Sequence, residues 1–96
     1  MPTEEFISME ICSTHYQVDL AFLDALEEYG LIDVRIENEK RSIRTEDLRN
    51  LEKYIRLHYE LDINLPGIDA IRHLQERMVS LHHEIRELQN RLGQPE

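Results

Sequence analysis

Apolar residues near the start of the chain recur with helical spacing in two short stretches separated by a turn. Ser8 can cap a first helix over residues 9–15, and residues 16–18 form the turn. The predicted inward positions of this first helix are Met9, Ile11 and Cys12.

A second helix is predicted over residues 19–29, with Asp19 as its N-cap. Gly30 is well placed to take the left-handed conformation that ends a helix. The apolar stripe consists of Leu20, Leu23 and Leu26, widened by Phe22 and Tyr29. Two short helices joined by a turn predict a helix-turn-helix.

The periodicity then changes from helical to alternating. Two short runs flank a polar tip at residues 37–40, which predicts a β-hairpin, and a hairpin after two helices would be a wing. The runs are Leu31, Ile32, Val34 and Ile36 before the tip, and Ser42, Ile43 and Arg44 after it.

A third helix is predicted from a Thr45 cap to about residue 61, with Glu46 and Asp47 in its first turn, where the helix dipole favours acids. Its core-facing positions are expected to be Leu48, Leu51, Ile55 and Leu61, with Tyr54 and Leu57 alongside.

A long fourth helix follows, with Asn64 as a candidate N-cap and Pro66 in the first turn. At about 27 residues it would be ~40 Å long, more than so small a domain can cover by itself. Its apolar residues alternate at spacings of three and four over three heptads: Ile71, Leu74, Met78, Leu81, Ile85, Leu88 and Leu92. This stripe predicts a homodimer through paired helices. The alternative is that its first half packs on the chain's own core and the rest frays. The flanking heptad positions do not decide whether the pair is parallel or antiparallel.

Charge changes the interpretation of the helix-turn-helix. The 96 residues hold 20 acids and 11 Lys or Arg, and residues 1–34 contain eight carboxylates and no Lys or Arg. A front end this acidic repels nucleic acid and anionic lipid, and attracts a basic protein. We therefore expect a docking surface for a basic partner, although an ordinary solvated helix face is the simpler alternative. The predicted partner-binding residues are Asp24, Glu27, Glu28 and Asp33.

The wing holds the few cations that could contact DNA phosphate. They are Arg35, Lys40, Arg41 and Arg44, offset at the tip by Glu37 and Glu39. Arg35, Arg41 and Arg44 are the candidate nucleic-acid contacts of the alternative hypothesis, a DNA-binding transcriptional regulator.

The residues offer little chemistry. Cys12 is the single cysteine and is expected in the core, and the adjacent His82 and His83 point about 100° apart on a helix, so no metal site is expected. No nucleophile–base pairing or phosphate loop occurs, so neither an enzyme nor a cofactor is expected. Because no basic, apolar leader and no long apolar run occurs, a cytoplasmic protein is expected.

Two segments carry a family resemblance. Residues 56–68, Arg-Leu-His-Tyr-Glu-Leu-Asp-Ile-Asn-Leu-Pro-Gly-Ile, and residues 28–32, Glu-Tyr-Gly-Leu-Ile, resemble the CbpM-type chaperone modulators, which are small MerR-like winged-helix proteins. The first segment is fairly specific, whereas the front end would fit any MerR-like domain. One departure from MerR-type regulators is that residues 22–28 carry no cation where those proteins usually place Arg for DNA.

The resemblance implies a protein that binds the J domain of a DnaJ-like co-chaperone of the CbpA type and blocks its engagement of DnaK. A J domain presents a basic helix, which an acidic surface could cover. The periodicity and the resemblance together predict the organisation of the chain. We expect a mostly α-helical, MerR-like winged helix-turn-helix over residues 1–62, a long helix over residues 63–93 and a tail over residues 94–96.

Overall fold

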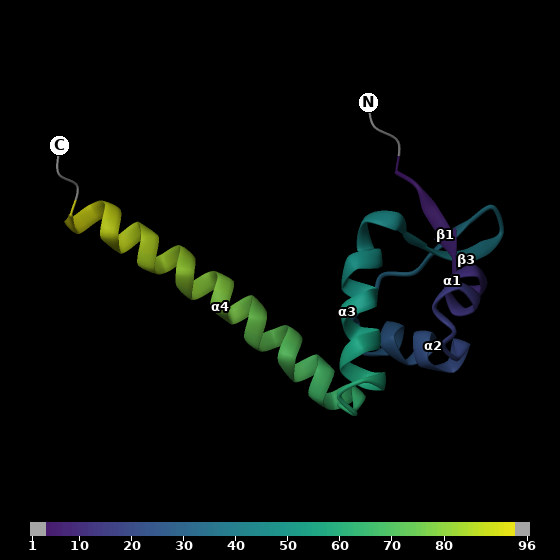
Figure 1. The fold of residues 1–96 in the computed structure, drawn as a ribbon. Coiled ribbons are helices and arrows are strands. Elements are labelled where there is room, and N and C mark those ends of the chain that lie inside the picture. Colours follow the sequence, from purple (N-terminus) through teal and green to yellow (C-terminus); the bar gives the residue numbers. More distant parts are fainter. Residues whose placement is uncertain (1–3, 94–96) are drawn as a thin grey trace.

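The computed structural model describes residues 4–93 and consists of a small winged part and one projecting helix (Figure 1). Its elements, in chain order, are β1 (Phe6–Ser8), α1 (Met9–Tyr16), α2 (Leu20–Glu28), β2 (Arg35–Glu37), β3 (Lys40–Arg44), a 3₁₀ turn (Thr45–Asp47), α3 (Leu48–Tyr59) and α4 (Leu65–Leu92). The predicted fold, a mostly helical winged helix-turn-helix followed by a long helix, is confirmed.

Local side-chain chemistry fixes the ends of α1. The hydroxyl of Ser8 accepts a hydrogen bond from the backbone N–H of Ile11 at 3.1 Å, as expected of an N-cap. Gln17 ends the helix in a left-handed conformation, with φ of 57°. The prediction that Ile11 faces inward was wrong, because its side chain is 55% exposed while Met9 and Cys12 are buried.

Helix α2 ends at Glu28, and Gly30 follows its C-cap Tyr29 in the predicted left-handed conformation, with φ of 73°. Asp19 occupies the N-cap position, but its side chain makes no capping hydrogen bond. The apolar stripe is narrower than predicted, because Leu23, Leu26 and Phe22 are buried whereas Leu20 and Tyr29 are more than a third exposed.

The predicted hairpin is confirmed, and it belongs to a three-stranded antiparallel sheet of order β1-β3-β2. Glu37 pairs with Lys40, so Asn38 and Glu39 form a two-residue turn, and both have positive φ as such hairpin turns require. Strand β1 was not predicted; it pairs with β3, with Ile7 opposite Ile43. The predicted Thr45 cap was wrong, since Thr45 begins the 3₁₀ turn and α3 starts at Leu48.

The buried apolar side chains of the described residues form one cluster. It contains Met9, Cys12, Val18, Phe22, Leu23, Leu26, Leu31, Ile32, Ile43, Leu51, Tyr54 and Ile68. Leu48, Ile55 and Leu57 pack against its edge. Leu61 was predicted to face the core but is 63% exposed, because α3 ends at Tyr59 and Leu61 lies in the turn that follows.

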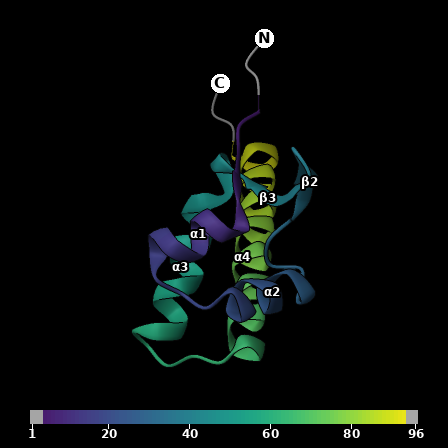
Figure 2. The ribbon, with the colours of Figure 1, turned by 90° about the vertical axis from the view of Figure 1, so that its right-hand side faces the viewer.

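Helix α4 begins as the sequence predicts and then leaves the rest of the chain. The Asn64 side chain accepts a hydrogen bond from the Gly67 N–H at 2.9 Å, and Pro66 lies in the first turn. Ile68 is fully buried in the core, and Lys53 of α3 donates to Gln75 at 2.6 Å. The rest of α4 extends away from the winged part (Figure 1). In the view of Figure 2 it lies behind the winged part.

The projection shows in the overall dimensions. The radius of gyration of the Cα atoms is 17.5 Å, whereas a compact chain of this length would have about 12–13 Å. No helix among residues 4–93 is long and apolar enough to cross a membrane. The predicted tail, residues 94–96, lies outside the described residues.

Candidate protein-binding surface

The acidic face of α2 is partly neutralised by the wing. Asp24 and Glu27 lie one helical turn apart, and Arg41 of β3 donates to both of them. Its Nη1 lies 2.8 Å from the Asp24 carboxylate, and its Nη2 contacts Glu27. These two hydrogen bonds raise the pKa of the Arg41 guanidinium. The trio therefore carries a net charge of −1 in place of the −2 of the two acids alone.

The other two predicted partner-binding acids differ in their surroundings. Glu28 is exposed at the end of α2 and makes no ion pair within residues 4–93. Asp33 is exposed and lies 3.4 Å from the Nε of Arg35. The structure thus places Asp24 and Glu27 together, Glu28 next to them in sequence, and Asp33 in a separate ion pair. Partner binding by these four residues stays a prediction.

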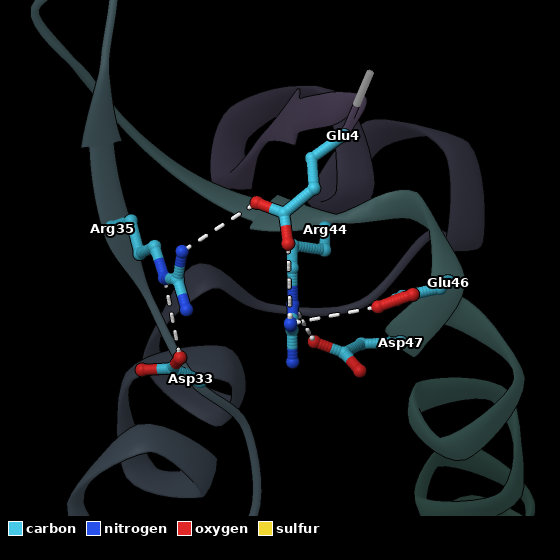
Figure 3. A network of polar contacts seen from close by, with 6 residues as sticks. All are labelled: Glu4, Asp33, Arg35, Arg44, Glu46 and Asp47. Atoms are coloured by element: carbon cyan, nitrogen blue, oxygen red, sulfur yellow. Dashed lines mark hydrogen bonds and ion pairs between the residues drawn. The ribbon is translucent and has the colours of Figure 1, made fainter. Parts of the chain in front are cut away.

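The remaining wing arginines lie in a second group of acids (Figure 3). Arg44 contacts the carboxylates of Asp47 at 3.2 Å, and of Glu4 and Glu46 at 3.5 Å each. Glu4 also approaches Arg35 at 3.6 Å, so it bridges the two guanidinium groups. Each of the three candidate nucleic-acid contacts, Arg35, Arg41 and Arg44, is therefore engaged by two or three carboxylates.

Sequence reasoning missed these pairings because it compared charges along the chain. Arg41 is 17 residues from Asp24 and 14 from Glu27, and only the fold of the wing over α2 brings them together. The one sequence feature that could have indicated these ion pairs was the presence of several cations in the wing of an otherwise acidic chain. Lys40, at the tip of the wing, is exposed and forms no ion pair with the described residues.

The heptad stripe of α4 is exposed along almost its whole length. Ile71 is half-buried, whereas every later seam position is at least 45% exposed. These positions are Leu74, Met78, Leu81, Ile85, Leu88 and Leu92. An apolar row of this length on one helix face is typical of an interaction surface.

Cysteine and histidine side chains often act in catalysis or metal binding, but Cys12 and His58 take part in the packing of the winged part. Cys12 is fully buried, as predicted, and burial raises the pKa of its thiol. His58 is stacked on Phe22 at 4.7 Å, and its Nδ1 lies 3.0 Å from the Ile63 carbonyl oxygen. Among residues 4–93, no group of His, Cys, Asp or Glu is arranged to hold a metal ion.

A winged helix-turn-helix with a long C-terminal helix defines the class of protein. A family model described as MerR HTH family regulatory protein matches residues 6–90, and the chain therefore belongs to the MerR HTH family. Proteins of this family are generally non-catalytic regulators or binders. The match does not distinguish a DNA-binding regulator from a CbpM-type modulator. No curated protein and no solved structure gives a significant match to the sequence.

Proposed function

We propose that this protein is a non-catalytic modulator of a DnaJ-type co-chaperone, and that it binds the J domain through the acidic surface of α2. The observation that carries the proposal is the engagement of all three wing arginines by carboxylates. DNA binding by this fold depends on cations that reach phosphate, and these three are already paired. Lys40 is the one wing cation without an ion pair in the described structure, and the acidic surface of α2 beside the wing fits a basic protein.

The proposed contact consists of Asp24, Glu27, Glu28 and Asp33. Glu28 is the member with no internal partner, so it is available to a basic residue at once. Asp24 and Glu27 share one guanidinium, which leaves carboxylate oxygens for a second cation. A J domain covered in this way could not present its basic helix to DnaK. Such electrostatic complementarity sets association rate and specificity, and it weakens with salt.

Calorimetric titration with the isolated J domain of the host's CbpA-like co-chaperone, at two salt concentrations, tests the proposal. We expect saturable binding that is weaker at the higher salt. The Asp24→Lys, Glu28→Lys variant should bind much more weakly. The control is Glu10→Lys with Glu60→Lys, which changes the net charge equally at exposed acids without ion pairs in the described structure. Equal binding by both variants would move the site elsewhere, and no binding by the wild type would refute the function.

We propose further that α4 pairs with the α4 of a second copy. The heptad spacing suits a helical partner of the same periodicity, and a second copy supplies that partner in every cell that makes the protein. The exposed seam residues would be buried between the two helices. Two modulator surfaces would then be carried by one dimer.

The family description supports a second candidate, a DNA-binding transcriptional regulator. Its phosphate contacts would be Arg35, Arg41 and Arg44, freed from their carboxylates. A mobility shift with specific operator DNA at ~150 mM salt would favour this candidate, because non-specific binding is weak under those conditions.

A further inference from the structure

The wing arginines are surrounded by acids from four different parts of the chain. Within residues 4–93, six carboxylates contact the three guanidinium groups. They come from the segment before β1, from α2, from the loop before β2 and from the 3₁₀ turn. We call this set the acidic mask: Glu4, Asp24, Glu27, Asp33, Glu46 and Asp47. The mask and the three arginines together carry three more negative than positive charges.

The three arginines of the wing lie near the surface, but each is paired with carboxylates of the mask. The side chains of Arg35 and Arg41 are 45% and 41% exposed, and that of Arg44 is 28% exposed. A guanidinium donates in a planar fork that suits carboxylate and phosphate alike. A phosphate approaching Arg44 would have to displace Asp47, Glu46 and Glu4, and it would be repelled by them before doing so.

We infer that the acidic mask is an autoinhibitory contact, in which the protein's own carboxylates take the place of DNA phosphates on the wing. The wing has the cations and the shape to bind a polyanion, and the carboxylates of the mask prevent this by occupying the guanidinium groups. The mask shares Asp24, Glu27 and Asp33 with the proposed J-domain contact, but the inference does not rest on that proposal, because it concerns only what the wing can bind once its acids are removed.

Fold stability does not require so many carboxylates at these positions. Most of these ion pairs lie near the surface, where solvent screening and the entropy cost of ordering the side chains leave them a small contribution to stability. The pair of Arg44 with Asp47 is more buried, with side chains 28% and 23% exposed, so the replacement there is the isosteric Asn. The core beneath them, including Ile43 and Leu51, is apolar and fully buried. Neutral isosteres at the mask should therefore leave the fold intact.

The test compares two triple variants of equal net charge. In the mask variant, Glu4→Gln, Glu46→Gln and Asp47→Asn release Arg44 and remove one of the two acids on Arg35. In the control variant, Glu10→Gln, Asp19→Asn and Glu60→Gln neutralise exposed acids that have no ion pair among residues 4–93. Binding to a mixed-sequence DNA duplex is measured by fluorescence anisotropy over a series of salt concentrations. Circular dichroism verifies that both variants are folded.

We expect the mask variant to bind about tenfold more tightly than the control variant at low salt for each arginine that reaches phosphate. The slope of log affinity against log salt should steepen by about 0.9 per arginine. Adding Arg44→Gln to the mask variant should remove the part of the gain that Arg44 contributes. Equal affinities of the two triple variants would show that only net charge matters and would overturn the inference, as would no binding by a folded mask variant.

A second variant covers the case in which the first does not fold. Asp24→Asn with Glu27→Gln releases Arg41, and its control is Glu10→Gln with Glu60→Gln. Tighter DNA binding than this control supports the mask, and equal binding refutes it. These outcomes are separate from J-domain binding, which is measured with a different ligand and does not use the mask variants.

Discussion

The seam of α4 allows the proposed dimer to be tested with one substitution, Leu81→Asp. Leu81 lies in the middle of the heptad stripe and is 45% exposed in the single chain. Pairing would therefore bury slightly less than half of this residue. Since a fully buried leucine contributes about 1.5–3 kcal/mol, each copy of Leu81 contributes about 1 kcal/mol to association.

Aspartate at this position removes that contribution and adds a cost. An unpaired polar group left in a buried interface costs about 1–3 kcal/mol, and more when it is charged. The loss is at least about 2 kcal/mol per copy and occurs twice in a symmetric dimer, so the dimer is weakened by at least about 4 kcal/mol. That corresponds to roughly a thousandfold in the dissociation constant.

Sedimentation equilibrium over a range of concentrations measures this change. We expect the wild type at twice the chain mass of 11.5 kDa and Leu81→Asp at the chain mass. Val79→Asp is the matched control, because Val79 is a 68% exposed apolar residue of the same helix outside the seam. The stability of the winged part should not change in either variant. A dimer that survives Leu81→Asp, or is broken equally by Val79→Asp, would refute pairing through the seam.

Two further predictions concern the winged part. Gly30→Ala should lower the free energy of unfolding by about 1–2 kcal/mol, because φ at Gly30 is 73° and no atom lies within 4 Å of the added Cβ, so the cost is conformational alone. In thermal unfolding Gly30→Asn should lose less, and an unchanged Gly30→Ala midpoint would contradict the argument. Burial, and after it the hydrogen bond to Glu52, raises the pKa of the Tyr16 hydroxyl to about 12. Between pH 10 and 12 the folded state therefore keeps the phenol proton of Tyr16, whereas the unfolded chain releases it. Stability should therefore decline over that interval, and tyrosinate absorbance should show Glu52→Gln lowering the pKa of Tyr16; the same titration in both proteins would rule out the contact.

Helix ends were predictable from local signals at three positions, although the local signal at Thr45 was misleading. Ser8, Gly30 and Asn64 act within three or four residues of their own positions, and each ends or begins a helix as predicted. The inward face of a short helix was harder to predict, because the roughly two turns in eight or nine residues do not define which side of the helix faces the core. Ile11 is apolar and adjacent to Cys12, yet it points to solvent.

Features that depend on distant pairing were not predictable from periodicity. Strand β1 has three residues and exists because Phe6–Ser8 meets β3, more than 30 residues later. The same holds for the ion pairs of Arg41, which form only when the wing lies over α2. The composition correctly indicated an acidic front end, but it could not indicate that the wing covers part of it.

The burial of Ile68 affects how the chain folds as it is synthesised. Ile68 comes from the first turn of α4 and fills the core of a domain whose other elements precede it. While the ribosome still encloses that turn, the nascent winged part lacks one fully buried side chain and cannot complete its packing. The rest of α4, including Leu74 and the seam residues beyond it, emerges later. Folding of the core during translation therefore begins before the surface for pairing is available, so each copy can close its own core before it meets another.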